Sequence, residues 1–466
     1  MKTVYDFTSQ AAPRGTNSVK WDTCAPDVIP MWVAEMDFPV APFIADALHK
    51  RIDRGVFGYT HVPESYYNSV IAWFGKRHGW NFTREQIIPI SGIVPAISVV
   101  LRALSMDGPL EPGAGVTASA SVRPKVIIHS PAYNCFFSNV RNTACELSAS
   151  VLLWDEVSHR YTVDWDDFER RCSEPGVAAF LLCNPHNPTG RLWNREELTR
   201  MGEICLRHGI PVISDEIHCE ICAPGTAYTP YASICPEFAQ NSVSFVSPTK
   251  AFNIAGLQVA NIVSANAGFR ERIGRVINDW EHCDVNQLGI VALESAYTDE
   301  GAEWLDEMNA VVHRNFLMLR DLFAQRFPSV RVPELEATYL LWLDFSGLFQ
   351  GVRPEDGASP DAIAALGRYP KNRRFSGTPE SCPSRDPLAG GGPKDPARGE
   401  APSSGELSGI AGRIVAETLL EKGRVRISDG TIYGDPRCCR LNLACPEATM
   451  REALRRIAET LSFTSV

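Results

Sequence analysis

The sequence predicts an α/β fold built on a mainly parallel β-sheet. Short and nearly continuous apolar runs recur along the chain, and such runs are typical of strands that are covered on both faces. Helical periodicity separates these runs, as in residues 194–208, where Asn194 can cap the helix and Gly209 can end it. Polar and turn residues follow each run, where ligands bind in open α/β sheets.

Composition is that of a globular protein with two or three domains: 466 residues, 44% hydrophobic and 21% charged. The net charge of -10 gives no reason to expect nucleic acid or an anionic membrane as a partner. The N-terminus lacks the apolar core of a signal peptide. The apolar stretch 87–104 is interrupted by Pro89, Gly92, Pro95 and Arg102, so we expect no membrane span.

Fourteen cysteines are scattered along the chain, several of them inside apolar runs. This usage is typical of buried thiols in the reducing cytoplasm, which is the expected location. Cys219 and Cys222 have a C-x-x-C spacing, but no second pair lies at a distance typical of zinc sites. We therefore interpret both, and the pair Cys438 and Cys439, as core thiols, and expect no metal site.

The first hundred residues predict an extended arm followed by helices. Two prolines in the apolar stretch 29–39 favour an extended segment. Helices are predicted at 42–54 and 64–78, joined by a glycine-spaced loop that presents Tyr59. A third helix, 96–104, follows Gly92 and Pro95. Its free backbone N–H groups could hold a phosphate, although an ordinary buried helix start explains the segment equally well.

Five apolar runs are predicted to be strands: 126–133, 177–190, 210–218, 243–250 and 259–264. Lys250 alone is better explained as a surface lysine than as a catalytic one, although burial in a crowded turn would lower its pKa and free its amine. Single-residue explanations exist for each of the other polar side chains at the strand ends. Their coincidence at one edge of the sheet nevertheless predicts a functional site made of Tyr133, Asn187, Asp215, His218, Ser247 and Lys250.

The C-terminal third predicts a second, smaller unit. Helices should fill 269–327 and strands 332–345. Residues 367–405 contain too little apolar material to fold, and we interpret them as a solvated insert, with a shorter one at 107–124. Order should return with a helix at 412–422, strands at 425–428 and 440–444, and a terminal helix.

These residues resemble the class I/II aminotransferase superfamily of pyridoxal-phosphate enzymes, fold type I. Within it, the chain is similar to the MalY/PatB branch of cystathionine β-lyases, which are carbon–sulfur lyases. The blocks that carry the resemblance are residues 32–38, 57–60, 91–97, 130–133, 183–190, 214–218, 247–256 and 440–446. The resemblance implies a seven-stranded, mainly parallel sheet covered by helices, and a smaller α/β C-terminal domain. It divides the chain into an arm that joins the small domain (1–44), a large cofactor-binding domain (45–287) and a small domain with the insert (288–466).

The resemblance also implies a role for each residue around the pyridoxal 5′-phosphate ring. Lys250 would carry the cofactor aldehyde and act as general base at the substrate Cα. Asp215 would face the pyridine nitrogen, and two opposite charges about 4 Å apart are worth on the order of 4 kcal/mol at an effective dielectric near 20. Asn187 would donate to the ring O3′, with His218 near the same edge. Tyr133 would stack on the ring.

The remaining implied roles concern the phosphate and the substrate. The phosphate would be held by Gly92, Ile93, Val94, Ser247 and Thr249, and by Tyr59 of a neighbouring subunit, so a homodimer with sites at the subunit interface is implied. Arg440 would bind the substrate α-carboxylate bidentately, with Val33 and Ala34 beside the substrate.

The resulting hypothesis is α,β-elimination of L-cystathionine or a related cysteine S-conjugate to thiol, pyruvate and ammonia. Two residues depart from the family pattern: Glu35 replaces the usual Asp, and Gln258 stands where many aminotransferases place a phosphate-binding arginine. The branch tends to lack that arginine, which mildly favours a lyase. Two alternatives stay open: an aminotransferase, and a regulatory protein that binds a transcription activator. The physiological thiol, and a role in methionine synthesis, cysteine breakdown or detoxification, also stay open.

Overall fold

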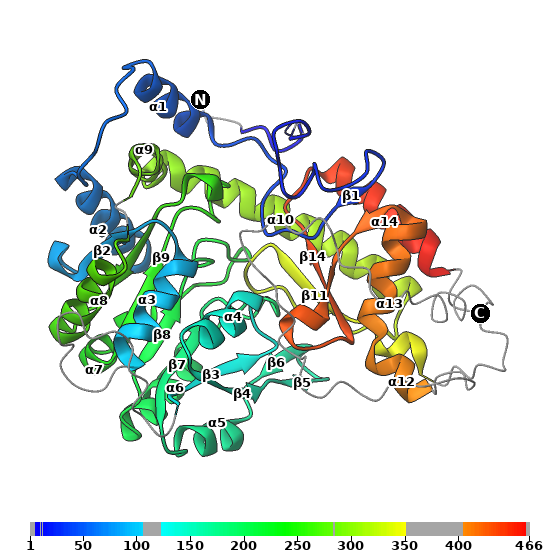
Figure 1. Cartoon of the computed structure of the whole chain (residues 1–466). Helices are drawn as coiled ribbons and strands as arrows, with labels where there is room; N and C mark the ends of the chain where they lie inside the picture. Colours follow the sequence, from blue (N-terminus) through cyan, green and yellow to red (C-terminus); the bar gives the residue numbers. More distant parts are fainter. Residues whose placement is uncertain are drawn as a thin grey trace.

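The structure is a computed structural model that describes residues 5–9, 11, 13–105, 123–282, 285–350 and 404–462. Most of the two predicted inserts, at 107–124 and 367–405, lies outside the described residues. The described chain forms a large sheet with helices on both faces, and a smaller group of strands and helices from the C-terminal part lies beside it (Figure 1).

A seven-stranded sheet forms the centre of the molecule, in the order β2-β10-β9-β8-β7-β3-β4. β10 pairs antiparallel with both neighbours, whereas β9, β8, β7, β3 and β4 are parallel. The predicted mainly parallel seven-stranded sheet is therefore confirmed. Its strands are β2 (Ile87–Ile90), β3 (Lys125–Ser130), β4 (Glu146–Val151), β7 (Val177–Cys183), β8 (Val212–Asp215), β9 (Ser242–Val246) and β10 (Ala260–Val263).

Two apolar clusters cover the two faces of this sheet, because successive side chains of a strand point to opposite faces. Ile128 of β3 packs in a cluster with side chains of α3, α4 and α8, whereas its neighbour Ile127 packs in a cluster with side chains of α5 and α6. Both side chains are completely buried. The helices are α3 (Ile93–Ser105), α4 (Asn134–Asn142), α5 (Trp165–Cys172), α6 (Arg195–Arg207), α7 (Pro236–Gln240) and α8 (Ala267–Asp279).

In the predicted helix at 194–208, the residues at the two ends determine where the helix begins and ends. The Asn194 side chain accepts a hydrogen bond from the Glu197 N–H, and the Glu197 side chain accepts one from the Asn194 N–H. Such a reciprocal cap satisfies two of the free donors of a helix start. Gly209 follows the helix with a φ of 66°, a conformation that glycine adopts without strain.

The N-terminal part matches its predicted helices more closely than its predicted extended arm. In the described part of the arm only the short strand β1 (Ile29–Pro30) is regular extended structure, and it pairs with β12 (Val425–Arg426) of the C-terminal part; bends at 33–35 and 37–38 interrupt the segment 29–39, which was predicted to be extended. The helices α1 (Pro42–Ile52) and α2 (Glu64–His78) follow, α1 ending two residues before the predicted end.

A three-stranded antiparallel sheet, in the order β11-β14-β13, organises the C-terminal part. Its strands are β11 (Leu340–Asp344), β13 (Ser428–Asp429) and β14 (Cys438–Asn442), so the strand predicted at 440–444 begins two residues earlier, and the run 332–345 forms a strand only from Leu340. A separate hairpin joins β5 (Leu153–Asp155) and β6 (Arg160–Thr162). The helices are α9 (Gln287–Ala296), α10 (Asp299–Arg326), α12 (Ser404–Gly409), α13 (Ala411–Thr418), the π-helical η5 (Leu419–Gly423) and α14 (Glu447–Ser462).

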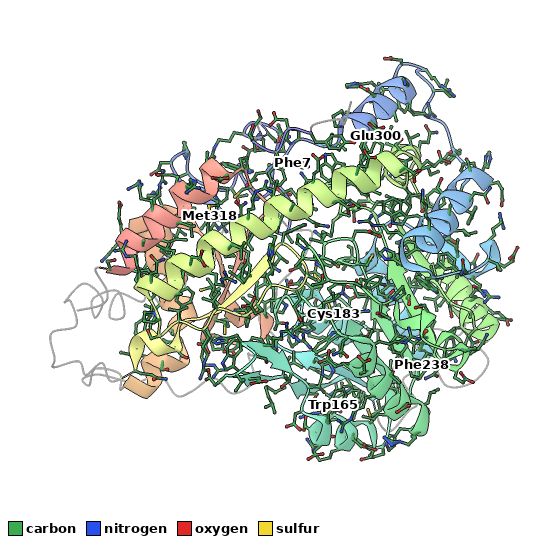
Figure 2. The ribbon with its side chains drawn as sticks, turned by 180° about the vertical axis from the view of Figure 1, so that it is seen from behind. Phe7, Trp165, Cys183, Phe238, Glu300 and Met318 are labelled. Carbon is green, nitrogen blue, oxygen red and sulfur yellow. The ribbon has the colours of Figure 1, made fainter. Side chains whose placement is uncertain are left out.

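Helix α10 connects the two halves of the molecule. With 28 residues it is about 42 Å long, and Figure 2 shows it running from Glu300, on the side of the large sheet, to the C-terminal elements beyond Met318. Its buried face packs in one core cluster with α2, the arm, β11 and α14. None of the helices in the described part is long and apolar enough to cross a membrane.

Candidate active site

The carboxyl ends of five parallel strands meet along one edge of the large sheet. Residue pairing across the sheet places Cys183 beside Asp215, and Asp215 beside Phe245. The chain leaves β9 at Ser247, whose hydroxyl donates to the carbonyl of Val259 at 2.7 Å. The polar residues that follow each strand in the sequence therefore gather at this edge, as the sequence predicted.

Lys250 lies in the turn that follows β9. Its ammonium donates to the Ala34 carbonyl oxygen at 2.8 Å, so the lysine is fastened to the N-terminal arm. Burial lowers the pKa of Lys250 to about 8, and the charge of Arg440 adds to this lowering, whereas Glu35 opposes the shift. At this pKa about a tenth of the lysine is the neutral, nucleophilic amine at pH 7, far more than at the ordinary lysine pKa.

Asp215 ends β8 and is 3% exposed. Burial raises the pKa of its carboxyl to about 7. The hydrogen bond that the Ile217 N–H donates to the carboxyl, at 3.2 Å, opposes this rise. The negative charge of Glu216 adds to the rise. His218 lies three residues further and is also buried, and its Nδ1 has no hydrogen-bond partner among the described atoms. Burial lowers the pKa of His218 to about 3, so its imidazole is neutral.

Asn187 and Arg440 contact each other directly. Arg440, on β14, donates from Nη1 to the Asn187 side-chain oxygen at 3.1 Å and from Nη2 to the Trp32 carbonyl at 3.0 Å. The guanidinium carbon lies 4.5 Å from the centre of the Tyr433 ring, and Nε is buried without a hydrogen-bond partner among the described atoms. The guanidinium therefore joins the Asn187 loop, the arm and the C-terminal sheet.

Gly190 fixes the loop that carries Asn187. Its φ of 73° favours glycine, and a Cβ at this position would lie 2.9 Å from a methyl group of Leu335. The Gly190 carbonyl accepts hydrogen bonds from the backbone N–H groups of Glu336 and Ala337 at 3.1 and 3.0 Å. The segment that leads into β11 therefore clamps this loop in place.

The residues expected to hold a phosphate lie at the start of α3 and in the turn before Lys250. Helix α3 begins at Ile93, so the N–H groups of Ile93 and Val94 lie in its first turn, where a helix has no partners of its own. A Cβ on Gly92 would meet only the ring of Pro95, at 3.7 Å. Both hydroxyls of the turn are within hydrogen-bond distance of each other, Ser247 Oγ lying 2.7 Å from Thr249 Oγ1.

Tyr133 and Tyr59 differ in their positions. Tyr133 directly follows the turn at the end of β3 and precedes α4, at the same edge as Asp215. Tyr59 is fully exposed in the loop between α1 and α2. Within one chain, the described contacts do not join Tyr59 to the residues at the edge of the sheet.

Sequence reasoning missed Tyr339, which precedes β11. Its hydroxyl donates to the Ala34 carbonyl at 3.0 Å, beside the bond from Lys250, and its ring lies nearly perpendicular to the His218 ring, with 6.2 Å between the ring centres. The only sequence signal was a hydroxyl-bearing aromatic residue at the start of an apolar strand.

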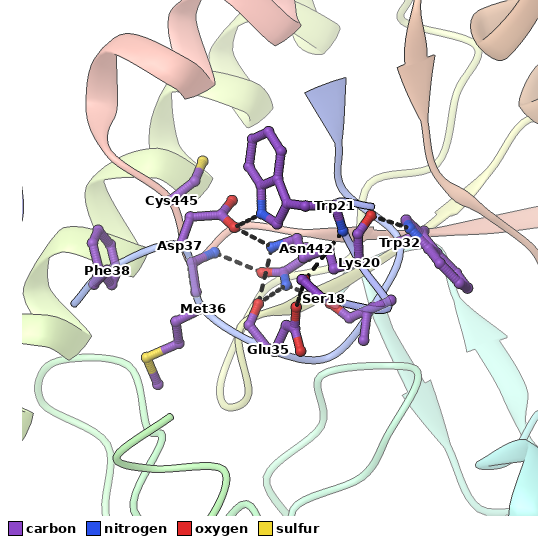
Figure 3. A network of polar contacts seen from close by, with 12 residues as sticks. Ser18, Lys20, Trp21, Trp32, Glu35, Met36, Asp37, Phe38, Asn442 and Cys445 are labelled. Atoms are coloured by element: carbon purple, nitrogen blue, oxygen red, sulfur yellow. Dashed lines mark hydrogen bonds and ion pairs between the residues drawn. The ribbon is translucent and has the colours of Figure 1, made fainter. Parts of the chain in front are cut away.

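A buried network that the sequence did not reveal holds the arm that carries Val33 and Ala34 (Figure 3). The Lys20 ammonium, 1% exposed, lies 2.8 Å from an oxygen of Asp37, which also accepts from the Trp21 ring at 2.8 Å. Asn442 donates to the carbonyls of Val33 and Glu35, both at 2.6 Å. The arm is therefore pinned on both sides of Ala34.

A second cluster of potential ligands lies elsewhere, formed by His78, Cys219 and Glu220. The buried Glu220 carboxylate already contacts nitrogens of Trp73, Arg77 and His78, each at 2.7 Å. Because the arginine brings its positive charge to the carboxylate, this cluster is better explained as a structural ion pair than as a metal site.

The edge of the sheet fits pyridoxal phosphate. Asp215 is a buried carboxylate, and no cation of the described residues is bonded to it. It is therefore free to pair with a protonated pyridine nitrogen, which requires a carboxylate partner. The unpartnered His218 Nδ1 and the amide of Asn187 can serve polar atoms of the ring. The N–H groups at the start of α3 suit a phosphate.

Comparisons with known proteins agree with this fit. Residues 26–457 match the sequence model of the aminotransferase class I and II family. The chain is 32% identical to cystathionine beta-lyase PatB of Bacillus subtilis, over 98% of this chain and 100% of the relative. Its structure is similar to cystalysin from Treponema denticola, which contains pyridoxal 5′-phosphate (27% identity, TM-score 0.78, 99% of each chain). It is also similar to the PLP-bound C-S lyase from Staphylococcus hominis (25% identity, TM-score 0.76, 98% of this chain and 99% of the other).

Proposed function

Since this chain belongs to the class I and II aminotransferase family, we propose that it is a pyridoxal-phosphate-dependent carbon–sulfur lyase of the cystathionine β-lyase type. It has the fold of PLP enzymes of fold type I, and its cofactor is pyridoxal 5′-phosphate. Its substrate is L-cystathionine or a related cysteine S-conjugate, and its products are a thiol, pyruvate and ammonia. The observation that carries the proposal is the placement of a desolvated Lys250 beside Asp215 and Arg440, in a chain similar along its whole length to a cystathionine β-lyase.

Each end of the cofactor has its own partners in this proposal. When bound, pyridoxal phosphate supplies an aldehyde for the substrate amine and a ring that draws electrons from the bonds at the substrate Cα. Asp215 would hold the proton on the ring nitrogen, and Asn187 and His218 would serve the edge that carries O3′. Tyr133 would cover one face of the ring. The N–H groups of residues 92–94, with Ser247 and Thr249, would hold the phosphate.

Lys250 moves the proton at the substrate Cα. Its lowered pKa supports this role, because a base must be neutral to accept a proton near neutral pH. The Ala34 carbonyl, which it contacts at 2.8 Å, then holds the ammonium form after proton uptake. Tyr339 shares that carbonyl and so limits its movement.

Arg440 binds the substrate α-carboxylate. Its planar fork offers two parallel donors to a carboxylate. To do so it exchanges its bonds to Asn187 and to the Trp32 carbonyl for bonds to the substrate. The loss of the Cα proton and the departure of the thiolate from Cβ together leave a product that hydrolyses to pyruvate and ammonia.

The assembly and location are proposals as well. The division into an arm (1–44), a large domain (45–287) and a small domain (288–466) is supported by the separation of the seven-stranded sheet from the three-stranded sheet and by the pairing of β1 with β12. A homodimer is supported by the full exposure of Tyr59, which would reach the phosphate of the partner subunit. A cytoplasmic location is supported by twelve free cysteines in the described part.

The test is a paired product assay. Purified holoenzyme given L-cystathionine should release homocysteine and pyruvate in equal amounts, and the Lys250→Ala variant should release neither. Transfer of the amino group to a keto acid without release of thiol would instead identify an aminotransferase. Absence of elimination from every cysteine conjugate would refute the proposal.

A further inference from the structure

Glu35 directly follows Ala34, the residue of the arm that Lys250 contacts. Residues 32–35 are partly exposed, whereas Met31 before them and Met36 after them are buried. The Ala34 carbonyl accepts hydrogen bonds from both Lys250 and Tyr339. The side chain of the next residue, Glu35, is partly exposed on the arm that Figure 3 shows, and its charge acts on that of Lys250.

No cation of the described residues is bonded to the Glu35 carboxylate. The nearby ammonium of Lys20 contacts an oxygen of Asp37 at 2.8 Å and the backbone carbonyl of Glu35 at 3.0 Å. Among the described residues, the only hydrogen bond to the carboxylate is a long one from the Ser18 hydroxyl, at 3.4 Å. Burial raises the pKa of Glu35, although the charges of Lys20 and Lys250 oppose the rise. A partly buried carboxylate without a counter-ion is unfavourable, so a cationic partner would stabilise the charged form of Glu35.

The backbone of Glu35 is fixed even though its carboxylate is not. Its carbonyl accepts from Lys20 at 3.0 Å and from Asn442 at 2.6 Å. The backbone that carries the carboxylate is thus fixed before any ligand binds, and such preorganisation reduces the cost of binding.

We propose that Glu35 binds an ammonium group carried by the leaving thiol, and so selects cysteine S-conjugates with a cationic tail. This inference rests on the proposed lyase function and names the substrate class of the same site. Arg440 binds the α-carboxylate at one end of the substrate, and the substrate amine engages the cofactor. Glu35 is the charged side chain within residues 32–35, the partly exposed stretch of the arm that contains Ala34, and its charge acts on that of Lys250. L-Cystathionine, whose leaving thiol carries an ammonium, belongs to the selected class.

Two nearly isosteric substrates test the inference. S-(2-aminoethyl)-L-cysteine ends in an ammonium where S-propyl-L-cysteine ends in a methyl group. The ratio of their kcat/KM values should fall about tenfold in Glu35→Gln, because a hydrogen-bonded charge pair is lost only for the first substrate. Intrinsic differences between the two leaving thiols cancel in this comparison. Glu237→Gln, an exposed position on α7, is the matched control and should leave the ratio unchanged.

Equilibrium binding gives a second readout that needs no turnover. The Lys250→Ala variant, loaded with cofactor, should bind the aminoethyl conjugate more tightly than the propyl conjugate in calorimetry. Adding Glu35→Gln should weaken binding of the aminoethyl conjugate about tenfold and leave that of the propyl conjugate unchanged.

The outcomes distinguish a failure of the inference about Glu35 from a failure of the proposed lyase function. An equal loss for both conjugates in Glu35→Gln would mean that Glu35 only positions the arm, and would overturn the inference. An unchanged ratio would overturn it as well and show the carboxylate to be merely solvated. If the wild-type enzyme eliminates neither conjugate, nor cystathionine, the lyase function itself fails.

Discussion

The buried pair of Lys20 and Asp37 should be the most sensitive element of the arm. Lys20→Met keeps the length of the side chain but leaves the Asp37 carboxylate, 3% exposed, without its counter-ion. Removing one partner of a buried pair costs about 3 to 5 kcal/mol. Because Trp21 still donates to the carboxylate at 2.8 Å, we expect the lower end, about 3 kcal/mol of unfolding free energy.

The double variant Lys20→Met/Asp37→Asn isolates the charge. It removes both charges, while the new amide oxygen at position 37 can still accept from the Trp21 ring, and it should recover most of the loss. Urea unfolding of the holoenzyme followed by circular dichroism measures both variants. Lys76→Met is the surface control: its partner Asp299 is 81% exposed, so the loss should stay below about 1 kcal/mol. A single variant as stable as the wild type, or a double variant no more stable than the single one, would refute the reasoning.

Three further predictions concern the site. Arg440→Lys should lower kcat/KM for cystathionine about 10- to 100-fold, because the ammonium cannot form the bidentate bond; steady-state kinetics check this, and an unchanged value would place the α-carboxylate elsewhere. Tyr339→Phe removes one of the two donors to the Ala34 carbonyl and should lower kcat up to about tenfold while the fold is kept; an unaltered kcat would show that Lys250 alone positions this carbonyl. The rate at which the cofactor-free protein takes up pyridoxal phosphate should rise with pH, with a midpoint near 8, because the neutral Lys250 amine is present above its pKa of about 8. Absorbance measured from about pH 6 to about pH 10 checks this rate, and a midpoint near the ordinary lysine pKa would contradict the lowered pKa.

The edge of the large sheet was predictable from the sequence because strand ends converge physically. Asp215 and Ser247 each end an apolar run, and parallel pairing of β8 with β9 brings such ends together whatever the intervening helices do. The roles of these residues stay predictions, because pairing fixes where a side chain lies and not what it does.

The direction of β10 could not be predicted from its residues. Residues 259–264 are as apolar as the parallel strands, yet β10 runs antiparallel to both β9 and β2. Strand direction depends on how the chain crosses between strands, and the connection from Lys250 to Val259 contains no long helix.

The arm network was not predictable for a different reason. Lys20 lies in a stretch without periodicity, where a lysine is normally solvated. Its burial depends on Asp37 and on the carbonyl of Glu35, in a loop whose path is set by Asn442 at the other end of the chain. The role of Tyr339 was not predictable for the same reason: its hydrogen-bond partner Ala34 is 305 residues away in the sequence.

The contacts between the arm and β14 have a consequence for biosynthesis. Arg440 meets the Trp32 carbonyl across 408 residues of sequence, and Asn442 meets Val33 across 409. During translation the arm leaves the ribosome long before its binding surface on β14 is made. The large sheet can form while the chain is still growing, but Ala34 reaches Lys250 in its fastened position only after β14 has emerged. A ribosome that stalls before residue 438 would therefore leave a folded sheet with an unfinished site.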